Sequence, residues 1–220
     1  MQRLEVGEGK ILGIVKGSGM IEPNMATMLA YILTDIKISK EDIYPMLKIA
    51  VDQSFNTISI DSDTSTSDTV ALLASGHKTA SMEELQIALN QVCHALALDV
   101  VKDAEGATKT MFVTVKNAMS QEQAKNAGKS IINSPLVKTA LFGHDPNWGR
   151  IAMALGKTDG LIFDPNRVEI SYGEYPIFSE NHEELQNIEQ IASYIQENED
   201  IYLTVDLHQG TQDFQVIGCD

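Results

Sequence analysis

The sequence predicts an α+β fold with layered sheets. Strand patterns and amphipathic helix patterns mix along the chain, without the strict alternation that is typical of a parallel α/β sheet. Hydrophobic residues make up 43% and charged residues 21% of the 220 residues, which is ordinary for a protein that buries a core. We find no internal repeat, low-complexity stretch or linker, and the length fits one large domain or two small ones.

Short apolar or alternating runs predict the strands. Two apolar runs, residues 11–15 and 28–33, are bounded by turn residues, and we expect them to be buried on both faces. The β-branched run at residues 57–60 predicts a further short strand. The remaining predicted strands cover residues 70–74, 111–116, 167–172 and 201–207.

Cap residues followed by apolar positions at helical spacing predict the helices. Ser39 is expected to cap a helix whose apolar face extends to Phe55. Ser81 with Glu84 forms a capping-box pattern before a long helix that reaches Val100. The other predicted helices follow Ser120 with Gln123, begin at Ser134-Pro135, and cover residues 185–195.

The charge balance narrows the range of partners. The chain has 31 acidic and 16 basic residues, a net charge of -15, which argues against nucleic acid or an anionic membrane surface. No apolar run is long enough to span a bilayer, and the first ten residues lack the apolar core of a signal peptide. Two cysteines, Cys93 and Cys219, form no framework of spaced pairs, so we expect a reducing, cytoplasmic location.

The chain is organised around the loop that joins the first two apolar runs, Lys16-Gly17-Ser18-Gly19-Met20-Ile21-Glu22-Pro23-Asn24-Met25-Ala26-Thr27-Met28-Leu29. Its glycines permit positive φ or close backbone approach, and Pro23 excludes the residue before it from the helical region. One hydroxyl residue, Thr27, stands at its end. From spacing alone, Thr27 simply satisfies a local hydrogen bond.

Three other segments invite functional interpretations that their spacing does not favour. The run Asp61–Asp68 has neither the glycine nor the final glutamate of a calcium loop, so a hydrogen-bonded turn is expected. Cys93 and His94 are neighbours on a helix and diverge by about 100°, which favours a buried structural cysteine over a nucleophile pair. In His144–Arg150 we find no further ligands at zinc spacing, and Pro146 and Gly149 indicate a rigid turn.

Within that third segment, Trp148 is expected in the core with its N–H satisfied. Asn147 and Arg150 remain open as residues that line a site, although single charged loop residues are usually solvated.

The central loop closely resembles the self-cleavage segment of the ornithine acetyltransferase family of arginine biosynthesis. Further motifs of that family follow in the same order. They are Ser54-Phe55-Asn56, Asp61-Ser62-Asp63-Thr64-Ser65-Thr66-Ser67-Asp68-Thr69, Asp103-Ala104-Glu105-Gly106-Ala107-Thr108-Lys109, Ser134-Pro135-Leu136-Val137-Lys138-Thr139-Ala140 and Phe142-Gly143-His144-Asp145-Pro146-Asn147-Trp148-Gly149-Arg150-Ile151.

The resemblance implies a helix–sheet–sheet–helix sandwich, incomplete in this chain, and cleavage between Ala26 and Thr27. Residues 1–26 would be the tail of the first (alpha) subunit. Residues 27–220 would be the second (beta) subunit, lacking the family's last strand and tail. Thr27 would be the catalytic nucleophile and a substrate contact, with Lys16 and Glu105 as further substrate-binding residues.

The implied reaction moves an acetyl group from N-acetylornithine to glutamate. Some members of the family also accept acetyl-CoA as donor; no cofactor and no metal are implied. The family's oxyanion-hole donors lie in the first subunit, so we expect this chain to need that N-terminal half, in a hetero-oligomer of cleaved halves. The alternatives are an N-terminal-nucleophile aminopeptidase and an inactive remnant or partner subunit.

Overall fold

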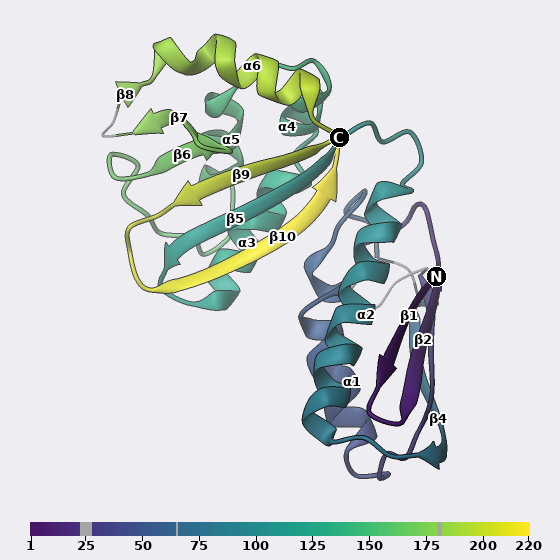
Figure 1. Cartoon of the computed structure of the whole chain (residues 1–220). Helices are drawn as coiled ribbons and strands as arrows, with labels where there is room; N and C mark the ends of the chain where they lie inside the picture. Colours follow the sequence, from purple (N-terminus) through teal and green to yellow (C-terminus); the bar gives the residue numbers. More distant parts are fainter. Residues whose placement is uncertain (23–27, 65, 180–181) are drawn as a thin grey trace. The chain divides into compact units, whose positions relative to one another are not determined.

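The computed structural model describes residues 1–22, 28–64, 66–179 and 182–220. It divides into two compact units, Met1–Glu105 and Gly106–Asp220, each an open sheet with helices packed on it (Figure 1). The prediction of an α+β fold is therefore confirmed. None of the described helices combines the length and the hydropathy that crossing a membrane would take. Each unit is described by itself below.

The first unit has a four-stranded sheet in the order β1-β2-β3-β4. The pairs β1–β2 and β2–β3 are antiparallel, whereas β3 and β4 are parallel, with the crossover between them carried by a helix. The strands are β1 Gln2–Val6, β2 Gly9–Lys16, β3 Leu29–Ile36 and β4 Thr69–Lys78. The helices are α1 Ile43–Asp52, the 3-10 turn η1 Phe55–Thr57, and α2 Met82–Lys102.

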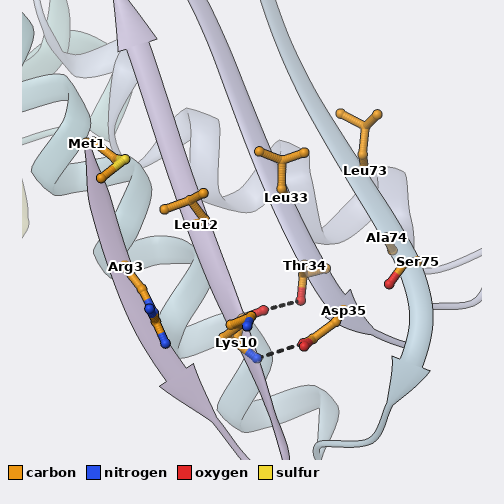
Figure 2. A pocket seen from close by; sticks show the side chains of 10 residues that line it. All are labelled: Met1, Arg3, Lys10, Leu12, Leu33, Thr34, Asp35, Leu73, Ala74 and Ser75. Carbon is orange, nitrogen blue, oxygen red and sulfur yellow. Dashed lines mark hydrogen bonds between the residues drawn. The ribbon is translucent and has the colours of Figure 1, made fainter.

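Helix α2 covers one face of this sheet closely. On that face Ile11 and Gly13 of β2 are buried, and a Cβ added to Gly13 would lie 2.5 Å from a methyl carbon of Val92 in α2. The glycine thus lets the helix approach the strand. On the opposite face Leu33 and Leu73 stay 39% and 50% exposed around a hollow of ≈ 670 Å³ (Figure 2).

The expectation that residues 11–15 and 28–33 are buried on both faces is therefore wrong. Ile14 is 43% and Tyr31 46% exposed, because α1 and α2 lie on the other side of the sheet and no described residue covers this one. A short apolar run does not reveal which of its faces finds a partner within the chain.

Two predicted boundaries in the first unit are also wrong. The N-cap of α1 is Asp42, not Ser39; the Ser39 hydroxyl and the Asp42 carboxylate instead hydrogen-bond to each other one turn earlier. Residues 57–60 form no strand, because Ser54 and Thr57 turn the backbone into η1 through bonds to main-chain carbonyls. The capping box of Ser81 and Glu84 on α2 is confirmed.

The second unit has a six-stranded sheet in the order β10-β5-β9-β6-β7-β8, in which only β5 and β9 are parallel. The strands are β5 Thr110–Ala118, β6 Glu169–Tyr172, β7 Tyr175–Ser179, β8 His182–Glu183, β9 Asp200–Asp206 and β10 Gln212–Cys219. The helices are α3 Gln121–Ile132, α4 Pro135–Phe142, α5 Trp148–Gly156, the 3-10 turn η2 Leu185–Asn187, and α6 Ile188–Glu197.

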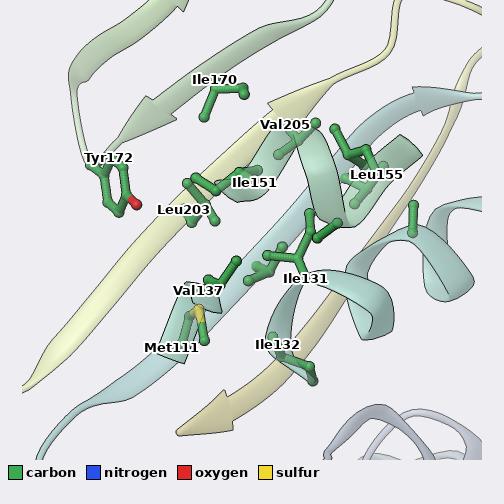
Figure 3. Close-up of a cluster of buried hydrophobic side chains, with 14 of the residues drawn as sticks. Met111, Ile131, Ile132, Val137, Ile151, Leu155, Ile170, Tyr172, Leu203 and Val205 are labelled. Carbon is green, nitrogen blue, oxygen red and sulfur yellow. The ribbon is translucent and has the colours of Figure 1, made fainter. Parts of the chain in front are cut away.

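A continuous apolar core lies between this sheet and its helices (Figure 3). Helix α3 packs on β5 and β10, and the Cβ that Gly128 lacks would lie 2.8 Å from a methyl of Val216. The predicted N-cap at Ser120 is confirmed, since its hydroxyl accepts the N–H of Gln123. Ser134 stands at the N-cap position of α4 as expected, but its side chain makes no cap hydrogen bond.

The segment His144–Arg150 turns and then starts α5. Gly149 lies inside that helix, so the predicted rigid turn is shorter than expected and ends at Asn147, whose side chain accepts the N–H of Arg150. Trp148 is half-buried against the core and stacks on Phe178, with ring centroids 4.3 Å apart.

Candidate active site

The central loop leaves and re-enters the sheet at one hydrogen-bonded strand pair. Lys16, the last residue of β2, pairs with Leu29, the first residue of β3. The twelve residues between them therefore begin and end on adjacent strands. Residues 17–22 and 28 belong to the described part of this loop. The predicted cleavage site, Ala26 and Thr27, lies outside the described residues.

The described start of the loop has a backbone that suits glycine. Gly17 has a φ of +152°, and a Cβ there would lie 3.1 Å from Cδ1 of Ile21 and 3.5 Å from Cα of Met28. Met20 adopts the left-handed region with a φ of 57°. Ile21 and Met28 are both almost fully buried and anchor the two ends of the loop.

The acidic run Asp61–Asp68 forms hydrogen bonds to the upstream arm of the loop, which is residues 17–22. Both carboxylate oxygens of Asp61 accept backbone hydrogens, Oδ2 from the N–H of Met20 and Oδ1 from the N–H of Ile21. Oδ1 also accepts the N–H of Asp63 at 3.1 Å. The run is thus a hydrogen-bonded turn, as predicted, and its carboxylate serves backbone amides.

Glu22 continues these contacts one residue further along the loop. Its N–H donates to the carbonyl of Asp63, and its own carbonyl accepts the hydroxyl of Thr64. Its carboxylate accepts the hydroxyl of Ser59 at 3.0 Å. The loop is therefore tied to the acidic run up to the last residue before the undescribed segment.

The same run also hydrogen-bonds to Met28, the described residue at the downstream end of the loop. Oδ1 of Asp68 accepts the N–H of Met28 at 2.6 Å, and the N–H of Thr69 donates to the Met28 carbonyl at 3.0 Å. Burial raises the pKa of the Asp68 carboxyl, and the bond from Met28 lowers it by less. The second oxygen, Oδ2, is buried and has no hydrogen-bond partner among the described residues.

Glu105, the last residue of the first unit in sequence, contacts the loop through its backbone. It follows α2 in sequence, and its backbone N–H donates to the carbonyl of Ser18 at 3.1 Å. Its side chain is exposed. The structure thus brings Glu105 to the loop that the sequence singles out, although 87 residues separate it from Ser18.

Lys16 borders a charged hollow beside this loop. The hollow measures ≈ 400 Å³ and is lined by Lys16, Gly17 and the end of α2, including Asp99, Lys102 and Asp103. Lys16 itself is exposed. A cation at the edge of such a hollow can meet the carboxylate of a small molecule.

The other side chains considered from the sequence have structural roles. Cys93 is fully buried in α2, and burial raises the pKa of its thiol to about 12, so the predicted structural role fits. Asn147 caps α5, and Arg150 donates to the carbonyl of Leu136 and the hydroxyl of Thr139. Both side chains therefore make structural contacts within the second unit.

The sequence did not point to Asp61 or Asp68 as individually important. Both lie in the acidic run, which belongs to the motifs that carry the family resemblance but was expected only as a hydrogen-bonded turn. In the described part of the chain no three His, Cys, Asp or Glu side chains gather in a way that could hold a metal ion.

Comparisons with known proteins show the family of the chain. The model of the ArgJ family matches residues 1–220. Arginine biosynthesis bifunctional protein ArgJ 2 of Clostridium acetobutylicum is 46% identical over 98% of this chain, and Glutamate N-acetyltransferase of Methanocaldococcus jannaschii is 45% identical over 96%. The chain spans about half the length of these curated relatives, 56% of each.

A solved structure of the same kind is also similar. The crystal structure of Arginine biosynthesis bifunctional protein argJ from Bacillus halodurans superposes with a TM-score of 0.83 at 33% identity. The match covers 88% of this chain and 94% of the solved one.

Proposed function

Because the chain belongs to the ArgJ family, we propose that it carries the nucleophile-bearing part of an acetyltransferase of arginine biosynthesis. The reaction would transfer an acetyl group from N-acetylornithine to glutamate, with acetyl-CoA as a further donor. Thr27 would be the nucleophile after self-cleavage between Ala26 and Thr27. The names of two relatives, an arginine biosynthesis bifunctional protein and a glutamate N-acetyltransferase, support this reaction.

The observation that carries the proposal is the convergence of distant residues on one loop. Lys16 and Leu29 close the loop, and Glu105 hydrogen-bonds to it through Ser18. These are the positions at which a lysine, a glutamate and a threonine would serve one site. A loop held this firmly at both ends suits a reaction of the backbone itself, which needs a fixed geometry.

Self-cleavage would begin with attack of the Thr27 hydroxyl oxygen on the carbonyl carbon of Ala26. The C–N bond breaks as the C–O bond forms, and the hydroxyl proton passes to the departing nitrogen. Water then hydrolyses the ester, which leaves a carboxylate on Ala26 and a free amino group and hydroxyl on Thr27. An α-amino group has a reference pKa of about 7.7–8.0, so it can act as a base near neutral pH.

Transfer would follow in two steps. The Thr27 amino group takes the hydroxyl proton while the oxygen attacks the acetyl carbonyl, and ornithine leaves with a proton on its nitrogen. Glutamate's amino group then attacks the acetyl-threonine ester and removes the acetyl group. Lys16 would hold a substrate carboxylate, and Glu105 would hold a substrate ammonium group.

We propose further that this chain works with an N-terminal half of the same family, in a hetero-oligomer of cleaved halves. The open face of the first sheet supports this, because Leu33 of β3 and Leu73 of β4 stay exposed there. An exposed apolar patch of this kind commonly marks an interface. Reduced cysteines at positions 93 and 219, both buried, fit a cytoplasmic enzyme.

The test is a transfer assay on this chain, alone and co-expressed with the N-terminal half of the Clostridium acetobutylicum relative. Intact mass reports cleavage, and ornithine release from N-acetylornithine with glutamate reports transfer. We expect a fragment that begins at Thr27 and activity only with the partner half. Thr27→Ala should stay uncut and lose transfer by roughly 10³-fold or more.

Three outcomes would contradict the proposal. Cleavage of a peptide amide without transfer would favour an aminopeptidase. An uncut chain in the presence of the partner half would favour an inactive remnant. Full transfer by Thr27→Ala would remove the nucleophile from the mechanism.

A further inference from the structure

One carboxylate binds the backbone on both sides of a strained residue near the start of the central loop. Met20 has a φ of 57°, a left-handed conformation that costs free energy for a residue with a bulky side chain. The N–H of Met20 donates to Oδ2 of Asp61, and the N–H of Ile21 donates to Oδ1. Consecutive amides around a left-handed residue form a concave site for an anion, and the Asp61 carboxylate occupies it.

Asp61 is the interaction that stabilises this conformation of Met20. The Met20 side chain is 51% exposed, so its own packing contributes little to the conformation. The carboxylate also lies close to the preceding residue, since a Cβ added to Gly19 would be 3.8 Å from Oδ2. Glycine adopts positive φ without strain, whereas methionine needs a compensating contact.

The backbone that Asp61 fixes carries the contact to Glu105. Two residues before Met20, the carbonyl of Ser18 accepts the N–H of Glu105 at 3.1 Å. The chain after Met20 is anchored, because Ile21 is buried and its carbonyl accepts the N–H of Ile60 at 2.6 Å. A return of Met20 to negative φ would therefore turn the preceding residues, and the Ser18 carbonyl with them, away from Glu105.

We infer that Asp61 is a positioning residue for the substrate site: it keeps Met20 left-handed, which places the Ser18 carbonyl and, through it, Glu105. Asp61 acts through these groups and touches no substrate itself. The inference rests on the proposed function, in which Glu105 holds a substrate ammonium group. N-acetylornithine carries such a group at the end of its side chain, whereas glutamate ends in a carboxylate. Loss of Asp61 should therefore weaken binding of the donor and not of the acceptor.

Asp61→Ala measures this effect. The enzyme is co-expressed with the partner half, and rates are expressed per cleaved active site, counted from the burst of ornithine, so that slower cleavage does not enter. We expect the KM for N-acetylornithine to rise about tenfold with kcat within about twofold, because the lost contact serves ground state and transition state alike. The kcat/KM for glutamate should stay within about twofold. Asp61→Asn keeps one acceptor oxygen at an exposed position, so it should fold even where alanine does not, and should raise the same KM about threefold.

Glu105→Gln separates positioning from general damage to the loop. By itself it should raise the KM for N-acetylornithine by about tenfold or more, because a charge-assisted contact is lost. In the Glu105→Gln background, Asp61→Ala should add less than about twofold, since residues that act through one another are not additive. A purely structural Asp61 would instead multiply the two losses.

Met20→Gly tests the backbone step. Glycine needs no carboxylate to hold positive φ, so Met20→Gly alone should keep the wild-type KM. Combined with Asp61→Ala, it should return the KM for N-acetylornithine to within about threefold of wild type. Asp63→Ala is the matched control from the same acidic run, because Asp63 contacts Asp61 and Glu22 through its backbone N–H and carbonyl. It should leave the KM within about twofold.

The outcomes separate this inference from the proposed function. An active Asp61→Ala enzyme with wild-type KM overturns the inference and leaves the proposed function standing. So do multiplied losses in the Glu105→Gln background, equal losses for both substrates, or a Met20→Gly substitution that fails to rescue Asp61→Ala. A wild type that is neither cut nor active with the partner half overturns the proposed function and this inference together.

Discussion

The two sheets differ most clearly on the face that no described helix covers. In the first sheet, one cross-strand row consists of Arg3, Leu12, Leu33 and Leu73. In the second sheet, an equivalent row consists of Gln215, Thr114, Thr204 and Ser171. Both rows cross four strands, yet one is mainly leucine and the other is entirely polar.

Two side chains of the polar row hydrogen-bond to each other. The Gln215 side chain donates to the Thr114 hydroxyl at 3.0 Å. Two residues earlier on β5, on the same face, Phe112 stacks on Tyr202 with ring centroids 4.7 Å apart; Phe112 is 6% and Tyr202 50% exposed. Such a face can meet water at little cost.

The leucines of the first row do not bury one another. Leu33 and Leu73 keep 39% and 50% of their surface exposed, although they are neighbours in register. Apolar surface that stays in water does not contribute the stabilising free energy of burial, which is about 25 cal/mol per Å². The two faces therefore differ in the type of side chain they expose, and the leucine row of the first unit is the surface to which we propose that the partner half binds.

The largest effect should come from breaking the leucine row. Leu33→Asp puts a charge at its centre, and we expect the affinity for the partner half to fall by about 100-fold or more, because a charge would be buried in an apolar contact. The stability of the isolated chain should change by less than about 1 kcal/mol, because the position is partly solvated. Isothermal titration calorimetry and urea unfolding measure the two quantities.

Thr114→Asp supplies the matched control on the polar row. It adds the same charge at a central strand and should leave the affinity within about twofold, since charges at solvated positions contribute little. Equal losses from both substitutions would show that the partner does not distinguish the two faces, and the comparison would then explain nothing about assembly.

The second prediction concerns the sheet faces that helices α2 and α3 cover. A glycine lets helix and sheet approach in both units, Gly13 on strand β2 and Gly128 on helix α3. Gly13→Ala should destabilise the chain by about 1–3 kcal/mol, because its Cβ would meet methyls of both Val92 and Leu96 within 2.6 Å. Gly128→Ala meets Val216 at 2.8 Å, but alanine gains about 0.8–1.0 kcal/mol of helix propensity there.

The net cost of Gly128→Ala should therefore be smaller than that of Gly13→Ala, and urea unfolding gives both. A Gly128→Ala chain that loses more stability than Gly13→Ala would mean that α3 packs more tightly on its sheet than α2 does. Gly156→Ala is the control for propensity alone, since the added Cβ meets nothing within 4 Å.

Local patterns predicted most of the fold. Cap residues with apolar spacing located α2 and α3, because the side chain and the backbone amide it satisfies are three residues apart. The strand expected at residues 57–60 failed because local hydroxyl bonds from Ser54 and Thr57 outweighed β propensity. Strand β10 was not predicted, since its pairing with β5 joins residues about a hundred positions apart.

The site was predictable only where a motif marked it. Lys16, Thr27 and Glu105 were expected from the resemblance, and the contact between Glu105 and Ser18 could not be read from their separation. Asp61 and Asp68 lie in one of the resembling motifs, but no individual role was assigned to them. A carboxylate that binds backbone amides needs no particular partner side chain, so no spacing rule identifies it.

The smallest effect concerns the two helix caps. Ser81→Ala on α2 and Ser120→Ala on α3 should each cost about 1 kcal/mol at neutral pH, because each hydroxyl accepts a backbone N–H. Their pH dependence should differ. The hydrogen bond from Ser81 holds the pKa of Glu84 below its usual 4.5, whereas the corresponding residue of α3, Gln123, does not titrate.

A carboxyl whose pKa is lower in the folded state stabilises the fold above its unfolded pKa and loses that contribution as pH falls through the folded pKa. The cost of Ser81→Ala should therefore be full at pH 7 and shrink below about pH 4.5, while the cost of Ser120→Ala stays constant. Urea unfolding of both variants and wild type between pH 3 and 7 measures the difference. Two parallel curves would mean that the capping carboxylate of the first unit contributes no more than the neutral amide of the second.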